Sequence, residues 1–336
     1  KNEIKNPLTK NIVIILILSA IVIGNAAYEA GNISGGVLGL ETVFGEKYLN
    51  LLNYHINFYS VILGLIAFSL LFLGNYKILE KSLIFLVIIM SLSFIITAII
   101  TKPDIIKLVQ GLLIPKFPKG SILIIIGLIG TTVVPYNLFL HASLVKEKWK
   151  NVNDLKLARN DTIIAIALGG IVSMCIVISS ASLNIVSINN ASDLAKGIEP
   201  LYGVNSKYIL AVGLFSAGIT SAITAPLAAA YVAAGCLGWS IKLKSIKFRA
   251  VWMFILLMGV LFSSLGFKSV EIIKFAQITN GILLPVIAGL LIWIVNKESV
   301  MGKFKNSKWQ NLIGLFIVVI TVFLGLKSIL KVFEIL

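Results

Sequence analysis

Residues 130–141 read Gly-Thr-Thr-Val-Val-Pro-Tyr-Asn-Leu-Phe-Leu-His and place Pro135 inside a long apolar stretch. Proline lacks a backbone N–H and its ring clashes with the preceding helical turn, so carbonyls near residues 131–133 can lose their partners. Unwound backbone at membrane depth is tolerated only where it is buried in protein or lines a cavity. The stretch fits an ion-binding break and a simple proline kink equally well, and by itself it leaves both open.

The composition indicates what surrounds this stretch. The chain has 336 residues, of which 58% are hydrophobic and 13% charged, and its mean hydropathy is +0.99. Soluble domains are about one quarter charged, so this composition excludes soluble enzymes, and its apolar content excludes disordered chains. The net charge of +15 is spread over short connections between apolar runs, which indicates membrane topology and no nucleic-acid partner. We expect an integral membrane protein.

Apolar runs predict the helices of this protein. A helix needs about 20 mostly apolar residues to cross roughly 30 Å of hydrocarbon. Nine such runs predict one polytopic membrane domain over residues 1–336, with residues 1–10 as a polar tail. The runs lack the alternation typical of a membrane barrel, so the predicted fold is an all-α integral membrane bundle. The spans are expected near residues 11–40, 57–73, 82–101, 121–141, 161–183, 208–237, 251–267, 272–295 and 312–333.

The distribution of Lys and Arg predicts the orientation. These residues are concentrated in the N-terminal tail and in alternate connections, which are therefore expected to be cytoplasmic. The N-terminus is then inside and the C-terminus outside. One connection, residues 102–120, is basic although it falls on the outer side. Its prolines and isoleucines predict a short interfacial helix there.

Polar side chains gather in the first predicted span. Asn25, Glu29 and Asn32 fall at positions i, i+4 and i+7, so they share one helical face. Ionisable groups at membrane depth are costly and are functional candidates by default. Glu29 is therefore expected to carry protons or cations, and the alternative is a protonated structural acid. The glycines of this stretch are expected to serve helix packing.

Two more polar residues lie in or beside spans. The amide of Gln277 can coordinate a cation through its oxygen or bond across helices, and both interpretations stay open. His141 can relay protons or simply lie at the cytoplasmic interface. The sequence has no phosphate-binding glycine loop, nucleophile elbow or His-Glu-x-x-His motif. We therefore expect neither an enzyme nor a resident cofactor.

At this point the residues resemble a known family. Residues 134–141 are similar to the Met-Pro-His-Asn-Leu-x-Leu-His signature that Nramp divalent-metal transporters carry on their sixth, unwound helix. Further similarities follow in order: residues 29–45 resemble the third helix, 216–221 the eighth, 276–285 the tenth, and 300–309 the loop before the eleventh. The resemblance implies an inverted-repeat, amino-acid-transporter-like bundle. Its nine helices match the family's third to eleventh, so we expect the first two to be missing.

The resemblance also implies a metal site. Thr131 matches a residue whose backbone carbonyl contacts metal, and Gln277 matches a polar residue that joins the occluded site. Val134 stands where the family has a sulfur ligand, and Asn137 closes the broken segment that faces Gln277. Thioethers favour manganese, iron and cadmium, whereas sites made of oxygen suit magnesium, so Val134 weakens selection against hard cations.

The resemblance also implies which residues pass protons and which mark the break in the helix. Glu29 and Asn32 stand at the positions of an Asp and a Glu that the family uses for protons, and His141 is a further candidate. Gly130 and Pro135 mark the structural break.

The predicted function follows from these assignments. It is a secondary transporter that imports divalent cations, manganese or iron, linked to protons, as a monomer in the plasma membrane. The alternatives are an Nramp-related magnesium transporter and a truncated membrane remnant that transports nothing.

Overall fold

The computed structural model describes residues 6–51, 54–73, 77–114, 116, 118, 120–132, 134–182, 191–239, 243–265 and 268–332. Val133, inside the predicted break, lies outside these ranges. The long helices are α1 (Pro7–Phe44), α2 (Phe58–Leu73), α3 (Lys77–Ile100), α7 (Leu155–Ser182), α10 (Ser206–Leu237), α11 (Ile246–Ser264), α12 (Ser269–Val295) and α14 (Lys308–Val332). The shorter helices are α4 (Ile105–Leu113), α5 (Ile122–Thr132), α6 (Pro135–Lys148), α8 (Ala191–Ala195), α9 (Glu199–Tyr202) and α13 (Glu298–Met301).

The helical membrane fold predicted from the apolar runs is confirmed. Within the described ranges, five helices are long and apolar enough to cross a membrane, or six if the bent pair α3 and α4 forms one span. Two further apolar helices, Phe58–Leu73 and Lys308–Phe323, are shorter. Every predicted span coincides with a helix, and the span near residues 121–141 coincides with the pair α5 and α6. The number of nine crossings stays a prediction.

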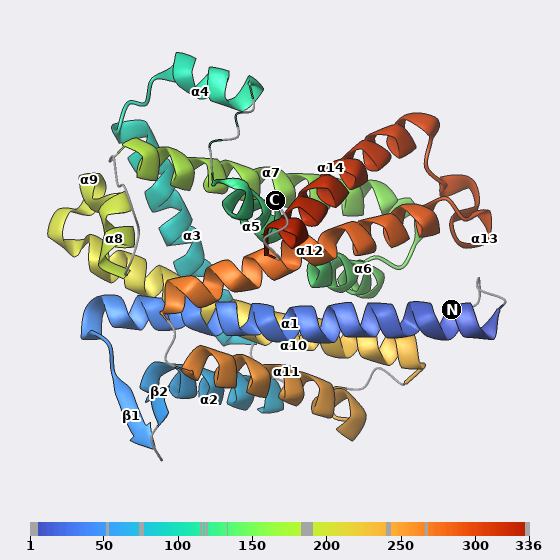
Figure 1. Ribbon diagram of the computed structural model, residues 1–336, viewed down its shortest axis with the longest axis horizontal. Helices are drawn as coiled ribbons and strands as arrows, with labels where there is room; N and C mark the ends of the chain where they lie inside the picture. The colour runs from blue at the N-terminus through green and yellow to red at the C-terminus, as the bar shows by residue number, and fades with distance from the viewer. Residues whose placement is uncertain are drawn as a thin grey trace.

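The centre of the bundle is formed by α1 and α10, which run side by side (Figure 1). Glycines allow this close approach. A β-carbon on Gly218 of α10 would lie 2.6 Å from the Cα of Gly36 on α1, and one on Gly39 would lie 2.6 Å from the carbonyl oxygen of Ala211. The expected packing role is therefore confirmed at Gly36 and Gly39. Gly35 is different, because a β-carbon there would meet nothing within 4 Å.

A second layer covers one side of α1 and α10. Helices α2 and α11 lie there, and their buried side chains, Leu63 and Trp252 among them, join Ile33 and Ile219 in one core cluster. On the other side α12 packs against α1, α5 and α14. Helix α7 exposes a row of large apolar side chains on its surface, Ile163, Ile164 and Ile166 among them, which suits a face that meets lipid.

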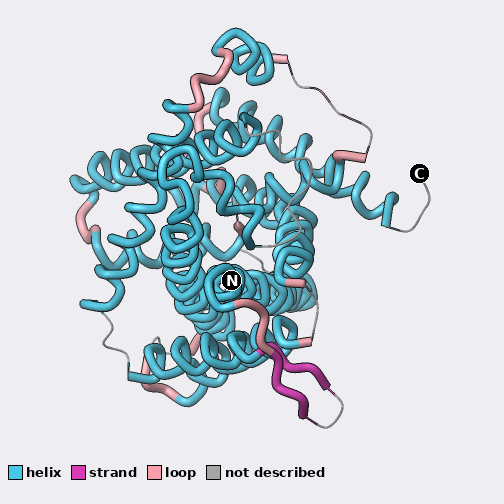
Figure 2. Tube along the Cα trace, turned by 90° about the vertical axis from the view of Figure 1, so that its left-hand side faces the viewer, coloured by secondary structure: helices cyan, strands magenta, loops and turns pink. Residues whose placement is uncertain are grey.

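One element was not predicted. An antiparallel hairpin of β1 (Tyr48–Leu51) and β2 (Tyr54–Asn57) connects α1 to α2, with Tyr48 opposite Asn57. It protrudes from the helical body (Figure 2). Its sequence lies in a connection between two apolar runs. Four-residue strands are too short to give a clear alternating pattern, so the sequence does not predict them.

Candidate metal-transport site

The helix containing Pro135 is interrupted. Helix α5 ends at Thr132 and α6 begins at Pro135, and Val134 between them has extended backbone with φ −78° and ψ 126°. The N–H of Asn137 donates to the carbonyl of Val134 over 3.0 Å, which closes the first turn of α6. The backbone is therefore interrupted before Pro135, and an ion-binding role of the interruption stays a prediction.

The break leaves a carbonyl suited to a cation. In an α-helix the carbonyl of Thr131 would accept from the N–H of residue 135, but Pro135 has none. The last carbonyls of any helix lack intrahelical donors, and they form the negative end of the helix dipole. Thr131 lies in the last turn of α5. Its carbonyl can therefore supply an oxygen to a metal ion.

Gln277 of α12 lies beside the same helix. A β-carbon on Gly127 of α5 would lie 3.8 Å from Cβ of Gln277 and 4.0 Å from its Oε1. Gly127 is one turn before Thr131, about 6 Å along the helix axis. The half-buried amide of Gln277 therefore lies along the final turns of α5. This places the two predicted oxygen donors on one packed helix pair.

Val134 and Asn137 are placed less favourably as donors. The side chain of Val134 is only 2% exposed and packs with Ala225 and Ala228 of α10, with Tyr28 and Leu140 beside them. It offers no ligand atom, and its carbonyl already accepts from Asn137. The side chain of Asn137 is exposed.

Glu29 forms a second polar centre. It is completely buried, and its Oε2 accepts a hydrogen bond from Nδ2 of Asn32 over 3.0 Å. Its Oε1 has no hydrogen-bond partner, and no ion pair in the described part of the chain includes it. Charge on a carboxyl in such a place is costly unless a proton or a cation accompanies it.

Two neighbours of Glu29 were missed at the sequence level. On α11, Gly259 receives its side chain, since a β-carbon there would lie 2.3 Å from Cγ of Glu29. On α1 itself, the preceding residue Tyr28 belongs to the cluster around Val134. A glycine among apolar residues gives no signal of this role, whereas the adjacency of Tyr28 to Glu29 could have been noted.

The remaining candidates lie apart from this pair. The Nε2 of His141 is 3.0 Å from the hydroxyl of Thr162 on α7, and its side chain is exposed. The structure therefore does not bring His141 into the pair formed by Glu29 and Asn32. Asn25 donates through Nδ2 to the carbonyl of Ala225 over 3.1 Å, which ties α1 to α10.

Among the described residues there is no group of three or more His, Cys, Asp or Glu side chains that could hold a metal ion.

Comparisons with known proteins agree on one family. The family model described as "Natural resistance-associated macrophage protein-like" matches residues 2–331. A divalent metal cation transporter MntH of Caldanaerobacter subterraneus is 24% identical over 303 residues, which cover 87% of this chain and 69% of that protein. A metal transporter nramp1 homolog of Dictyostelium discoideum is 28% identical over 306 residues, with 84% and 56% covered.

A solved structure supports the fold. The crystal structure of the Eremococcus coleocola manganese transporter in complex with an aromatic bis-isothiourea substituted compound matches with a TM-score of 0.66 and 18% identity. The match covers 97% of this chain and 72% of the transporter. At this level of identity the likeness concerns the arrangement of helices.

Proposed function

Because this chain belongs to the Nramp family, we propose that it is a secondary transporter that imports divalent metal cations, manganese or iron, across the plasma membrane. The observation that carries the proposal is the break between α5 and α6. Pro135 has no N–H to donate to the carbonyl of Thr131, and Gln277 contacts α5 one turn before Thr131, at Gly127. Broken helices at membrane depth are typical of ion sites in secondary transporters.

The donor set favours magnesium as a second candidate cargo. Thr131, Asn137 and Gln277 offer carbonyl and amide oxygens, and Val134 supplies a hydrocarbon side chain where sulfur would select softer ions. Oxygen donors suit magnesium, whereas a thioether favours the softer ions. A comparison of manganese, iron and magnesium uptake separates the two cargoes.

Protons are proposed to move through Glu29 and Asn32. Support comes from the complete burial of Glu29 and the free Oε1, which leaves its charge without a fixed counter-ion. His141 is kept as a separate exchange point on the side predicted to be cytoplasmic, where it contacts Thr162. The orientation with the N-terminus inside and the monomeric state belong to this proposal.

The central experiment measures metal uptake into proteoliposomes that contain the chain expressed from its complete reading frame. We expect uptake of manganese or iron, and Gln277→Leu should reduce it by at least about tenfold, which corresponds to roughly 1.4 kcal/mol. Thr279→Val is the matched control, because its hydroxyl donates to the Phe275 carbonyl of its own helix. Equal loss in both variants would contradict the role of Gln277. If no divalent cation were taken up, the result would instead support the alternative of a truncated membrane remnant that transports nothing.

Proton linkage needs its own test. Glu29→Gln should abolish the dependence of uptake on pH, because an amide cannot gain or lose a proton in this range. Glu41→Gln is the control on the same helix, since Glu41 accepts from Asn57 and Ser269 at the far end of α1. An unchanged pH profile in Glu29→Gln would refute the proton role of Glu29. It would not contradict the proposal that the protein transports metal.

A further inference from the structure

Helix α4 has one apolar face that nothing in the described part of the chain covers. Ile105, Ile106, Val109, Leu112 and Leu113 are between 44% and 71% exposed, and no residue of α4 is buried. At about 100° per residue these five side chains fall within less than half of the helix circumference. Lys107 and Gly111 occupy the opposite side, and Gln110 flanks the apolar face. A strongly two-sided helix of this kind is typical of membrane surfaces.

The direction of α4 fits such a surface. The axis of Ile84–Ile100 in α3 and that of α4 differ by 116°. If α3 crosses the bilayer, α4 therefore runs close to the membrane plane. Figure 1 shows α4 at the edge of the molecule, carried on connections away from the central helices.

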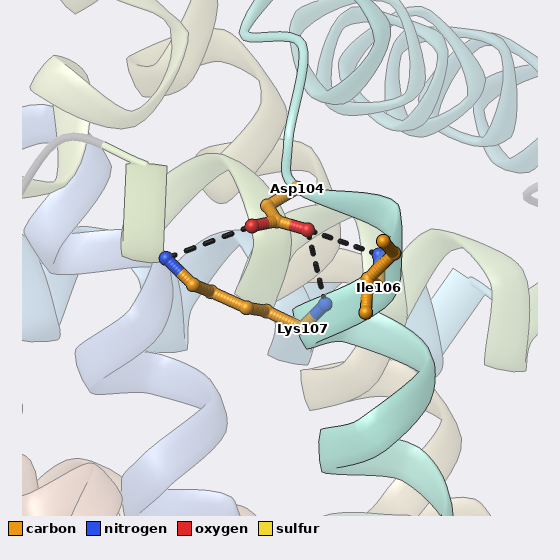
Figure 3. A network of polar contacts seen from close by, with 3 residues as sticks. All are labelled: Asp104, Ile106 and Lys107. Carbon is orange, nitrogen blue, oxygen red and sulfur yellow. Dashed lines mark hydrogen bonds and ion pairs between the residues drawn. The ribbon is translucent and has the colours of Figure 1, made fainter.

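The turn that sets this direction is well defined. Lys102 has left-handed backbone with φ 44°, and Pro103 follows it. Asp104 then caps α4, because its Oδ1 accepts from the N–H groups of Ile106 and Lys107 over 3.0 and 3.1 Å (Figure 3). The cap satisfies the first N–H groups of α4 and so fixes where the helix begins after the turn.

The charge of this segment is also specific. Lys102, Lys107 and Lys116 accompany a single acid, Asp104, in residues 102–116. All three lysines are exposed, and Lys107 lies 3.6 Å from the Asp104 carboxylate. Basic residues are unexpected in this connection, because the distribution of Lys and Arg predicts that it lies on the outer side. Anionic lipid headgroups carry the charge that complements these lysines.

We propose that α4 is a membrane-surface anchor. Its apolar face enters the boundary between headgroups and acyl chains, and Lys102, Lys107 and Lys116 bind the headgroups of anionic phospholipids. The anchor holds the connection between α3 and α5 against the bilayer, and α5 is the helix that ends at the break. This inference is independent of the metal that is transported.

The test measures the immersion of spin labels on the full chain in vesicles. Leu112→Cys labels the apolar face and Gly111→Cys the opposite face, where a β-carbon would meet nothing within 4 Å, in a background with Cys175→Ala and Cys236→Ala. We expect oxygen to reach the Leu112 label more readily than a water-soluble nickel complex does, and the reverse at position 111. Val109→Cys replaces Leu112→Cys if that variant is not produced. Equal water exposure on both faces would overturn the proposal, as would spin–spin broadening that shows a second copy on this face.

The lipid preference is tested with the same label. Immersion at Leu112 should increase in vesicles that contain phosphatidylglycerol instead of phosphatidylcholine alone, and added salt should weaken the increase. A triple variant that combines Lys102→Gln, Lys107→Gln and Lys116→Gln should remove this increase in immersion. The control is Lys297→Gln, Lys303→Gln, Lys305→Gln, on the connection between α12 and α14, which should leave it unchanged. Identical immersion in both lipids would refute the binding of anionic headgroups.

Discussion

Pro135 and Pro226 both lie inside predicted membrane spans, yet they have opposite effects on the backbone. At Pro135 the chain leaves one helix and begins another. At Pro226 the helix α10 continues without interruption from Ser206 to Leu237. Pro285 behaves like Pro226, within a continuous α12. The residue type alone therefore does not determine where a membrane helix breaks.

The surroundings explain the difference. Pro226 is flanked by fully buried alanines, and the carbonyl of Ala225 beside it accepts a hydrogen bond from Asn25 of α1. Side chains from neighbouring helices thus reach the backbone of α10 beside Pro226, while the carbonyl that Pro226 leaves without a helical donor is that of Ala222. At Pro135 the preceding Val134 is extended, and its side chain is buried against α10. Packing of Val134 stabilises the interrupted conformation there.

The strongest test exchanges the two prolines for alanine. Pro135→Ala restores the N–H that Thr131 lacks, so we expect slower hydrogen exchange across residues 131–137 and at least about tenfold less uptake. Pro226→Ala should leave uptake unchanged and raise the free energy of unfolding by about 1 to 3 kcal/mol. Uptake assays and exchange measured by mass spectrometry check both variants. If Pro226→Ala lowered uptake as strongly, the contrast between the two sites would be wrong.

The hydrogen bond beside Pro226 sharpens the comparison. Asn25→Ala leaves the buried Ala225 carbonyl without its side-chain donor, so the free energy of unfolding should fall by about 1 to 3 kcal/mol. Asn137→Ala removes an exposed side chain and should change it by less than about 0.5 kcal/mol, while uptake falls. Denaturation in detergent gives the free energy of unfolding of each variant. Equal destabilisation by the two variants would show that burial does not separate the regions.

Val134 tests whether the side chain at the break influences selectivity. Val134→Met introduces a thioether, so the ratio of cadmium or manganese uptake to magnesium uptake should rise several-fold. The larger side chain enters a filled site and should cost about 1 to 3 kcal/mol of stability. Leu140→Met places the same sulfur in the same cluster without entering the break. An unchanged ratio, or an equal change in the control, would refute the assignment.

The smallest expected effect concerns how helices begin. Helix α4 starts with a side-chain cap, whereas Val134 gives α6 none. The N–H of Lys107, which donates to the carboxylate, holds the pKa of Asp104 below its ordinary value, and the charge of Lys107 acts in the same direction. The cap therefore contributes fully to the stability of α4 above the ordinary pKa of an aspartate. This contribution is lost as the pH falls through the lowered pKa of Asp104. Mobility of the Leu112 label should rise over that acidic range.

Asp104→Asn is the control for this pH effect. Its amide oxygen keeps the cap but does not titrate, so label mobility should not depend on pH in the acidic range. The same acidic transition in both variants would assign the effect to another group.

Many residues of the candidate site could be predicted from the sequence, but few of the contacts between them could. The pairing of Glu29 with Asn32 follows from helical spacing, and the structure confirms it with a hydrogen bond. The contact between Glu29 and Gly259 joins helices far apart in the sequence, and glycine carries no chemical mark of such a role. His141 is a proton candidate through its residue type and its place in the signature of residues 134–141, and only the structure shows that it contacts Thr162 of α7.

The amino-acid sequence alone determined that this protein is a helical membrane protein and that Thr131 lacks a helical donor. Hydropathy and the missing N–H of proline are local properties, and they hold wherever the segment is placed. Only the tertiary structure showed which proline interrupts its helix: Val134 packs against α10 at the break, whereas Asn25 of α1 contacts the continuous helix beside Pro226. These contacts span up to 200 positions in the chain, and no local pattern encodes them.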